Sequence, residues 1–259
     1  MNPTKIKYKN PGSSSTTRFE RIHTVIFDNK KSGELLVAQE IKKLIEKNNK
    51  KNKKTVLGLA TGSSPKGVYK ALIDFHKNEN LSFKNVVTFN LDEYYGIKKD
   101  HSQSYHKFMK DNLFDHIDIN YNNVNIPKGN IDKKSIDNHC KDFEKKIKSS
   151  GGIDIQLLGI GANGHIGFNE PGSNINSITR LVKLDYQTRK DARFDFNGIK
   201  NVPSSAVTMG IKTILSSNRI ILLAWGLSKS ESVRAAVEYG QTVKIPASLL
   251  QSHINTCLL

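Results

Sequence analysis

Short, mostly apolar runs recur along this chain and alternate with longer stretches in which apolar and polar residues repeat with helical spacing. Four such runs lie at residues 56–60, 86–91, 153–160 and 220–225. Runs of this length and composition are typical of strands that are buried on both faces of a sheet. A further short strand is predicted at residues 24–27.

Helical patterns separate these strands. Residues 32–47 have the spacing of an amphipathic helix, and similar patterns occupy residues 65–75 and 136–147. Strands that alternate with helices predict βαβ units, and therefore an α/β fold whose mostly parallel sheet carries helices on both faces. Because no linker interrupts the chain, residues 18–259 are predicted to form a single domain after a flexible polar tail at residues 1–17.

Composition narrows the class of protein. The 259 residues are 37% hydrophobic and 25% charged, as in a soluble globular protein. No apolar run approaches the roughly 20 residues that cross a bilayer, and Met1 is not followed by the apolar stretch of a secretion signal. The cysteines, Cys140 and Cys257, lie too far apart in sequence for a zinc knuckle or a disulfide framework, so we expect a cytoplasmic protein without membrane contact.

The formal charge of +16 raises the question of nucleic-acid binding. Of the 40 basic residues, 33 are lysines and only seven are arginines, and most are scattered. Nucleic-acid surfaces favour arginine and cluster their charge, so we expect no nucleic-acid partner. The dense run at residues 47–54 is interpreted as a solvated helix end, and the net charge favours anionic small molecules instead.

Polar segments follow four of the predicted strands, at residues 61–65, 92–94, 161–165 and 226–229. In open α/β sheets, ligands bind in the crevice outside the carboxyl ends of the strands. These segments supply an anion-binding turn, a carboxylate, a histidine among glycines, and a lysine. The set predicts a site for a small phosphorylated molecule.

The first segment joins a strand to a helix, with Ser64 predicted as the helix N-cap and Pro65 as the first helical residue. Such a turn presents free backbone N–H groups to an anion, although an ordinary well-capped strand–helix turn is the alternative interpretation. This turn contains neither a Walker sequence nor GxGxxG, so we expect no nucleotide cofactor.

The acids and the histidine suggest proton-transfer chemistry. Asp92 and Glu93 could form a base, a metal site or a cap for the next element, and partial burial would raise the pKa of Asp92 toward a useful range. His165 lies among glycines, with Glu170 five residues further on to orient its ring. The spacing of metal-binding residues typical of zinc sites is absent, so we expect no metal.

Four motifs, in order along the chain, resemble the glucosamine-6-phosphate deaminase family. They are LGLATGSSP at residues 57–65, VVTFNLDEY at 86–94, GIGANGHIGFNEPG at 159–172 and AVTMG at 206–210. The resemblance extends from about residue 55 to the C-terminus and is closest to the longer, deaminase-like members with an extended N-terminus. It implies a modified Rossmann-like, doubly wound fold and a sugar-phosphate substrate in amino-sugar catabolism.

The resemblance also implies a reaction. D-glucosamine 6-phosphate and water would become D-fructose 6-phosphate and ammonia, without a cofactor. His165 would open the pyranose ring with support from Asn163 and Glu170, and Asp92 would move the C2 proton to C1. Some family members have Asp at the position of Asn163.

The family pattern implies the phosphate contacts less directly. The turn Thr61, Gly62, Ser63 and Ser64 matches its phosphate cradle, and Lys229 matches its phosphate-binding lysine. The second arginine of the family's Thr-Arg-x-x-x-x-Arg stretch stands one residue early, as Arg193, and Phe194 occupies the expected position. Either Arg193 still reaches the phosphate, or Lys229 and backbone groups hold it alone.

The residues of the allosteric site and the C-terminal end of the chain differ from the family pattern. Allosteric members bind an N-acetylated sugar phosphate with an Arg and a Lys after the Glu-Pro motif, whereas this chain has Arg180 and Val182, which predicts no such activation. The chain stops at residues 255–259, where the family would continue through its last strand and helix, and Leu258 and Leu259 would lie within that closing strand. A truncated product or a piece of a longer protein is therefore expected. Subunit number varies in the family, and a homo-oligomer is left open.

Two other functions remain as alternatives. The first is a related hydrolase of the 6-phosphogluconolactonase type, although Asp92, His165 and Glu170 in their deaminase context argue against it. The second is a non-catalytic or altered-specificity sugar-phosphate-binding homologue. A transcriptional regulator of this kind would need an N-terminal helix-turn-helix, for which the residues before Thr24 leave no room.

Overall fold

The computed structural model describes residues 19–259, and the polar tail predicted at residues 1–17 lies outside the described residues. Its helices and strands are, in chain order, β1 (His23–Thr24), α1 (Lys30–Asn49), β2 (Thr55–Leu59), α2 (Lys66–Glu79), β3 (Val86–Asn90), β4 (Asp92–Tyr94), α3 (Tyr105–Asn112), β5 (Val124–Asn125), α4 (Ile136–Ser149), β6 (Ile155–Gly159), β7 (Arg180–Lys183), α5 (Tyr186–Asp191), β8 (Ser205–Thr208), α6 (Ile211–Leu215), β9 (Ile220–Leu223), α7 (Ser230–Val237) and β10 (Thr256–Leu258).

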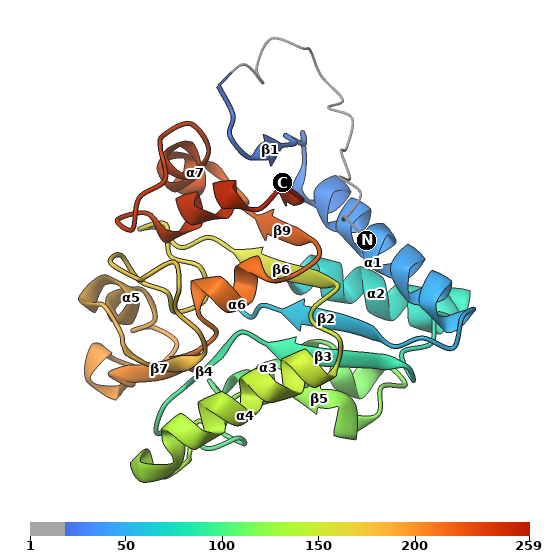
Figure 1. Cartoon of the computed structure of the whole chain (residues 1–259), viewed down its shortest axis with the longest axis horizontal. Helices are drawn as coiled ribbons and strands as arrows, with labels where there is room; N and C mark the ends of the chain where they lie inside the picture. The colour runs from blue at the N-terminus through green and yellow to red at the C-terminus, as the bar shows by residue number, and fades with distance from the viewer. Residues whose placement is uncertain (1–18) are drawn as a thin grey trace.

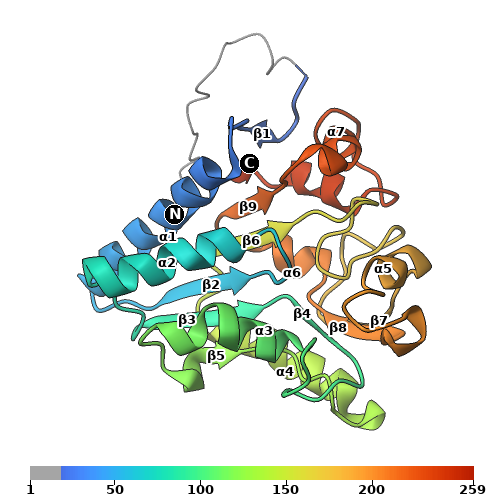
Figure 2. The same ribbon diagram turned by 180° about the vertical axis from the view of Figure 1, so that it is seen from behind.

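Seven strands form one parallel sheet in the order β1-β10-β9-β6-β2-β3-β5 (Figures 1 and 2). The four apolar runs correspond to β2, β3, β6 and β9, so the predicted α/β fold class is confirmed. Every residue of β2, β3 and β9 is buried, which explains why these strands read as nearly continuous apolar runs.

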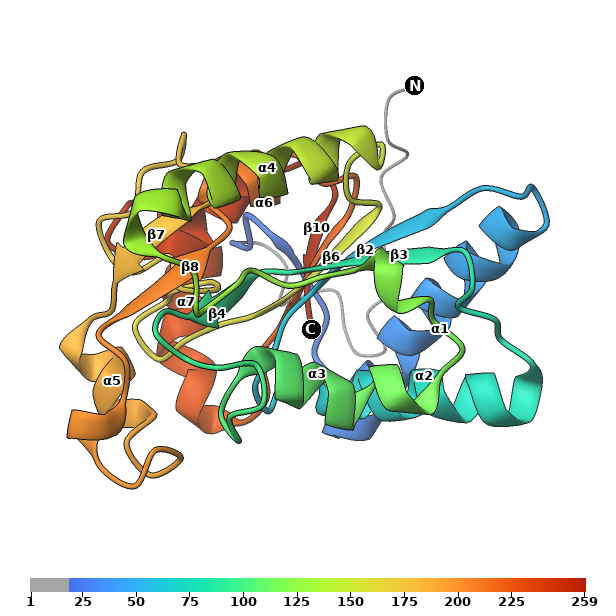
Figure 3. The ribbon, with the colours of Figure 1, turned by 90° about the horizontal axis from the view of Figure 1, so that it is seen from below.

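Helices cover both faces of this sheet. Figure 3 shows α1, α2 and α3 on one side and α4 and α6 on the other. Alternate residues along a strand point to opposite faces, so Leu57 packs in the core beneath α1 and α2 while Val56 packs in the core beneath α4 and α6. The predicted doubly wound arrangement is therefore present.

A second sheet, which the sequence did not predict, lies beside the first. It is antiparallel, with the order β4-β8-β7, and pairs Asp92 with Thr208. The chain leaves β3 at Asn90 and enters β4 at Asp92, so the acids expected just after the end of a strand lie in a short strand of their own. Such short strands carry too few residues for their period to stand out in the sequence.

The edges of the main sheet differ from the prediction. The strand predicted at residues 24–27 is limited to His23–Thr24, after which only the Val25 amide pairs with the Leu258 carbonyl. That strand pairs with β10, whose last residue, Leu258, is buried as expected for a closing strand. The lysines of residues 47–54 lie exposed at the end of α1 and in the turn that follows, as predicted.

The order of the strands locates a crevice. From β2 the chain adds β3 and β5 on one side, and then returns to add β6, β9 and β10 on the other side. The loops that follow β2 and β6 therefore run in opposite directions from the carboxyl ends of these two strands. Open α/β sheets bind ligands in the crevice at this position. No helix among residues 19–259 is long and apolar enough to cross a membrane.

Candidate active site

A pocket of about 340 Å³ opens at this crevice. Seven of the residues predicted to form the site line it: Thr61, Gly62, Ser63, Ser64, Asp92, His165 and Lys229. Asn163 and Glu170 contact His165 from outside the lining, and Arg193 is not part of the lining. The sheet thus brings together residues separated by up to 168 positions in the chain, from Thr61 to Lys229.

The turn after β2 is held in place by its neighbours. Gly62 has a φ of +84°, a left-handed conformation that favours glycine, and the Trp225 indole donates a hydrogen bond to the Ser64 carbonyl over 3.0 Å. The prediction for Ser64 is wrong, because Pro65 occupies the N-cap position and no side chain caps α2. An uncapped helix start leaves backbone N–H groups for an anion, which favours a phosphate-binding turn over an ordinary capped one.

Asp92 is the most perturbed carboxyl group of the pocket. Its residue is only 5% exposed, and no hydrogen bond to its side chain is present among residues 19–259. Burial, followed by the charge of Glu93, raises the pKa of Asp92 from 3.8 to about 8. A carboxylate in this state accepts a proton strongly once ionised, as a general base must.

Glu93 has a different task from its neighbour. Its carboxylate is buried and accepts hydrogen bonds from the backbone N–H groups of Tyr105 and His106 and from the Ser104 hydroxyl. These groups lie at the start of α3, so Glu93 caps the next helix. Of the alternatives for the acid pair, capping holds for Glu93, while Asp92 alone faces the pocket.

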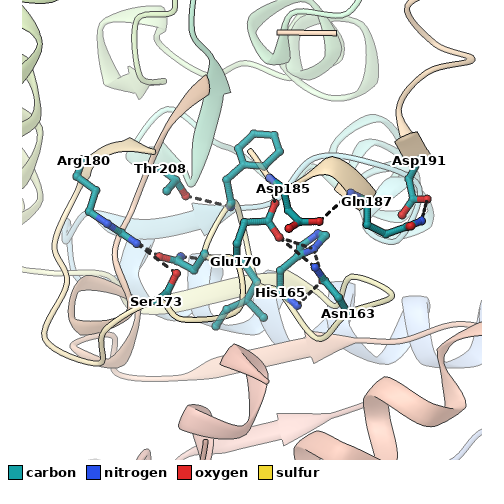
Figure 4. Close-up of polar contacts among 12 residues, drawn as sticks. Asn163, His165, Glu170, Ser173, Arg180, Asp185, Gln187, Asp191 and Thr208 are labelled. Atoms are coloured by element: carbon teal, nitrogen blue, oxygen red, sulfur yellow. Dashed lines mark hydrogen bonds and ion pairs between the residues drawn. The ribbon is translucent and has the colours of Figure 1, made fainter. Parts of the chain in front are cut away.

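His165 is oriented by Asn163 and Glu170 (Figure 4). The Asn163 Oδ1 lies 2.6 Å from His165 Nδ1, and the Asn163 amide donates to Glu170 Oε2 over 3.1 Å. The same Glu170 oxygen is 3.6 Å from Nδ1. Glu170 therefore acts on the ring largely through Asn163, whereas the sequence suggested a direct contact.

This chain of contacts determines which nitrogen of His165 carries a proton. Because the Asn163 amide nitrogen donates to Glu170, its oxygen accepts from Nδ1–H, and Nε2 keeps a lone pair. Burial lowers the pKa of His165 most, the charge of Glu170 opposes this, and Lys229 lowers it further. The imidazole is thus neutral near pH 7 and can accept or return a proton through Nε2.

Backbone space at two glycines permits this geometry. A Cβ on Gly161 would lie 2.2–2.4 Å from ring atoms of His165, closer than any side chain can come. A Cβ on Gly167 would lie 3.2 Å from the Asp92 carboxylate, and Gly167 also has a positive φ of +56°. The glycines around His165 let the loop approach both reacting groups.

Lys229 provides positive charge at the pocket, and Arg193 points elsewhere. Lys229 ends a short 3-10 helix after Gly226, which has a φ of +84°. The Arg193 guanidinium donates to the Lys190 carbonyl over 2.6 Å and stacks on the exposed Phe194 ring at 4.0 Å. Its part in holding a phosphate stays a prediction.

Sequence reasoning missed several residues that line the pocket, among them Tyr94, Tyr105, Asp191 and Asp195. Tyr94 packs against Tyr105 at 5.2 Å between ring centroids and forms part of a small aromatic cluster. Only Tyr94 had a signal, since it ends the VVTFNLDEY motif. Among the described residues no group of three or more His, Cys, Asp or Glu side chains could hold a metal ion.

Several known proteins are similar in sequence to this chain. Residues 29–258 match the family model of glucosamine-6-phosphate isomerases and 6-phosphogluconolactonases. A glucosamine-6-phosphate deaminase of Clostridium acetobutylicum is 52% identical over 206 residues, covering 79% of this chain and 84% of the relative. A Bacteroides thetaiotaomicron protein, named only as glucosamine-6-phosphate deaminase-like, is 45% identical over 93% of this chain but 36% of its own length.

Two solved structures are similar in fold to this chain. A monomeric glucosamine-6-phosphate deaminase has a TM-score of 0.87 and 43% identity, covering 92% of this chain and 96% of its own. A 6-phosphogluconolactonase of Thermotoga maritima, with a TM-score of 0.68 and 20% identity over 91% of this chain and 97% of its own, shares the fold.

Proposed function

The chain belongs to the family of glucosamine-6-phosphate isomerases and 6-phosphogluconolactonases, and from this premise we propose that it is a glucosamine-6-phosphate deaminase that uses Asp92 and His165. It converts D-glucosamine 6-phosphate and water to D-fructose 6-phosphate and ammonia, a step of amino-sugar metabolism. One observation carries the assignment of residues: a buried carboxyl group and a neutral imidazole face the same pocket at the crevice of the sheet.

Ring opening falls to His165. The pyranose opens when a proton leaves the C1 hydroxyl and another reaches the ring oxygen, and Nε2 of a neutral imidazole can carry out this transfer. Asn163 and Glu170 hold the ring of His165 in the required tautomer. Both are therefore positioning residues in this proposal.

Isomerisation falls to Asp92. The ionised carboxylate removes the proton from C2, which gives an enolamine, and returns a proton to C1 to give an imine at C2. Water then hydrolyses the imine to the ketone and ammonia. The chemistry needs one positioned carboxylate and no redox cofactor, and the ammonium group of an incoming substrate favours the charged form of Asp92.

Phosphate binding is assigned to the turn Thr61, Gly62, Ser63 and Ser64, at the uncapped start of α2, together with Lys229. The N–H groups of such a turn and a lysine are a common pairing for a phosphate. In this proposal, residues 18–259 act as one domain. The protein works in the reducing cytoplasm, where the buried thiols of Cys140 and Cys257 stay free.

The decisive assay measures ammonia release from D-glucosamine 6-phosphate, coupled to glutamate dehydrogenase. We expect turnover in the native chain and none in Asp92→Asn, which keeps the size of the side chain but removes the base. The same samples are tested for hydrolysis of 6-phosphogluconolactone. Ammonia release that is equal in both proteins would overturn the role of Asp92, and lactone hydrolysis without ammonia release would favour the alternative hydrolase.

A further inference from the structure

A second and larger cavity lies away from the active site, at the free edge of the main sheet. It is a groove of about 750 Å³ that follows β5 between α3 and α4. Figure 3 shows these two helices on opposite sides of the sheet, and β5 is the edge strand beside β3. None of the residues that line this edge groove lines the active-site pocket.

The edge groove is unusually rich in lysine. Five of its fifteen lining residues are lysines: Lys99, Lys107, Lys110, Lys128 and Lys146. Lysine makes up 33 of the 259 residues of the chain, about one in eight, so the groove exceeds the average more than twofold. By contrast, Lys229 is the single lysine among the described residues that line the active-site pocket.

Three of these lysines form no ion pair among the described residues, although Asp100 and Asp142 also line the groove. Lys107 pairs with Asp111, and Lys110 lies 3.8 Å from Asp115. Within residues 19–259, no ion pair involves the other three, Lys99, Lys128 and Lys146.

Two of the unpaired lysines influence one side chain of the groove. His139 of α4 accepts a hydrogen bond from the Lys128 backbone N–H over 3.0 Å. Burial lowers the pKa of His139 most, followed by the positive charges of Lys128 and Lys146, while the charge of Asp142, which also lines the groove, opposes them. An anion placed there would relieve the repulsion between them.

The floor of the groove is apolar. Val124, Ile126, Phe114 and Phe143 line it, together with Tyr121, whose residue is 54% exposed and packs edge-on against Phe114 at 6.5 Å. An exposed aromatic ring in the same groove as unpaired lysines suits a ligand with both a planar group and several negative charges. The cavity volume is also within the usual range for small-molecule sites.

We propose that the edge groove binds a nucleoside di- or triphosphate, with the phosphates on Lys99, Lys128 and Lys146 and the base on the apolar floor near Tyr121. This ligand would occupy the edge groove while the active site is free to turn over its own substrate. The assignment does not depend on the reaction proposed above.

Calorimetric titration with ADP at about 0.15 M salt tests the site, because screening at this ionic strength suppresses weak surface attraction. We expect a dissociation constant below about 1 mM. The double variant Lys128→Gln/Lys146→Gln should bind at least about tenfold more weakly, since it removes two charge-assisted contacts. The matched control Lys70→Gln/Lys77→Gln removes the same charge from exposed positions on α2 and should bind like the native chain.

Two further measurements separate the edge groove from other sources of binding. Lys229→Gln removes the active-site lysine and should leave ADP affinity unchanged, while pyrophosphate should bind more weakly than ADP because it lacks the base. The proposal is overturned if ADP does not bind, if the control pair weakens binding equally, or if binding is lost in Lys229→Gln. Equal affinity for pyrophosphate and ADP would overturn the role of the floor.

Discussion

Replacing Asp92 by asparagine should make the protein more stable as well as inactive. The carboxyl group is buried beside Glu93, and its pKa is raised from 3.8 to about 8. Between these two pH values the folded protein keeps a proton that the unfolded chain has lost. The contribution of protonated Asp92 to the free energy of unfolding is therefore fully present below about pH 4 and is lost as the pH rises toward 8.

The magnitude follows from the two pKa values. They differ by about four, and one pKa unit corresponds to about 1.4 kcal/mol, so the full penalty has a ceiling of about 6 kcal/mol. Between pH 5 and pH 8 the ceiling is about 4 kcal/mol. Relaxation and water entry around the charge reduce such penalties, so we expect about 2–4 kcal/mol. An asparagine amide does not ionise and escapes this penalty.

Urea denaturation from pH 5 to pH 9 measures the effect. The free energy of unfolding of the native chain should fall relative to Asp92→Asn by the stated amount, with most of the change complete by pH 8 to 9. Asp74→Asn, at an exposed position on α2, serves as the control and should follow the native chain. Parallel curves for the native chain and Asp92→Asn would refute the reasoning, because the charge would then carry no burial penalty.

Further predictions concern the histidine and the phosphate contacts. Asn163→Asp places a carboxylate 2.6 Å from Nδ1 and should raise the pKa of His165, as followed by NMR titration of its imidazole; an unchanged pKa would contradict the orienting contact. Gly161→Ala puts a Cβ 2.2 Å from the imidazole and should lower kcat by about 100-fold or more while circular dichroism shows a retained fold. Lys229→Gln should raise KM for the phosphorylated substrate by about tenfold or more. Arg193→Gln should change KM less than threefold, because its guanidinium is bound to a backbone carbonyl, and an equal effect of both variants would show that Arg193 reaches the phosphate.

Local pattern was sufficient to predict the central part of the fold. The runs at residues 56–60 and 220–225 are the strands β2 and β9, and the helical pattern at residues 136–147 is α4. The helix is buried along one stripe and the strands are buried on both faces. The spacing of their apolar residues therefore shows which sides contact the core. Motifs after the strands could also be placed at one edge of the sheet, because parallel strands end on the same side.

Contacts between segments that are distant in sequence could not be predicted from local pattern. The second sheet pairs Asp92 with Thr208 through strands of three or four residues, which are too short to show a period. The burial that raises the pKa of Asp92 depends on the sequence-distant loop that carries Gly167. Similarly, Ser64 is of a residue type that commonly caps helices, but it is not the N-cap of α2 because the helix starts one residue later than predicted.

The sequence by itself determined the chemical inventory of the site: an anion-binding turn, a carboxylate, a histidine among glycines and a lysine, each at the end of a strand. Tertiary structure decided which of these residues meet and in what state. It turned Asp92 toward the pocket and Glu93 toward α3, interposed Asn163 between His165 and Glu170, and turned Arg193 away. The reason is physical, since composition fixes which groups can ionise or bind, whereas burial and neighbouring charge, which arise only on folding, set their pKa values and partners.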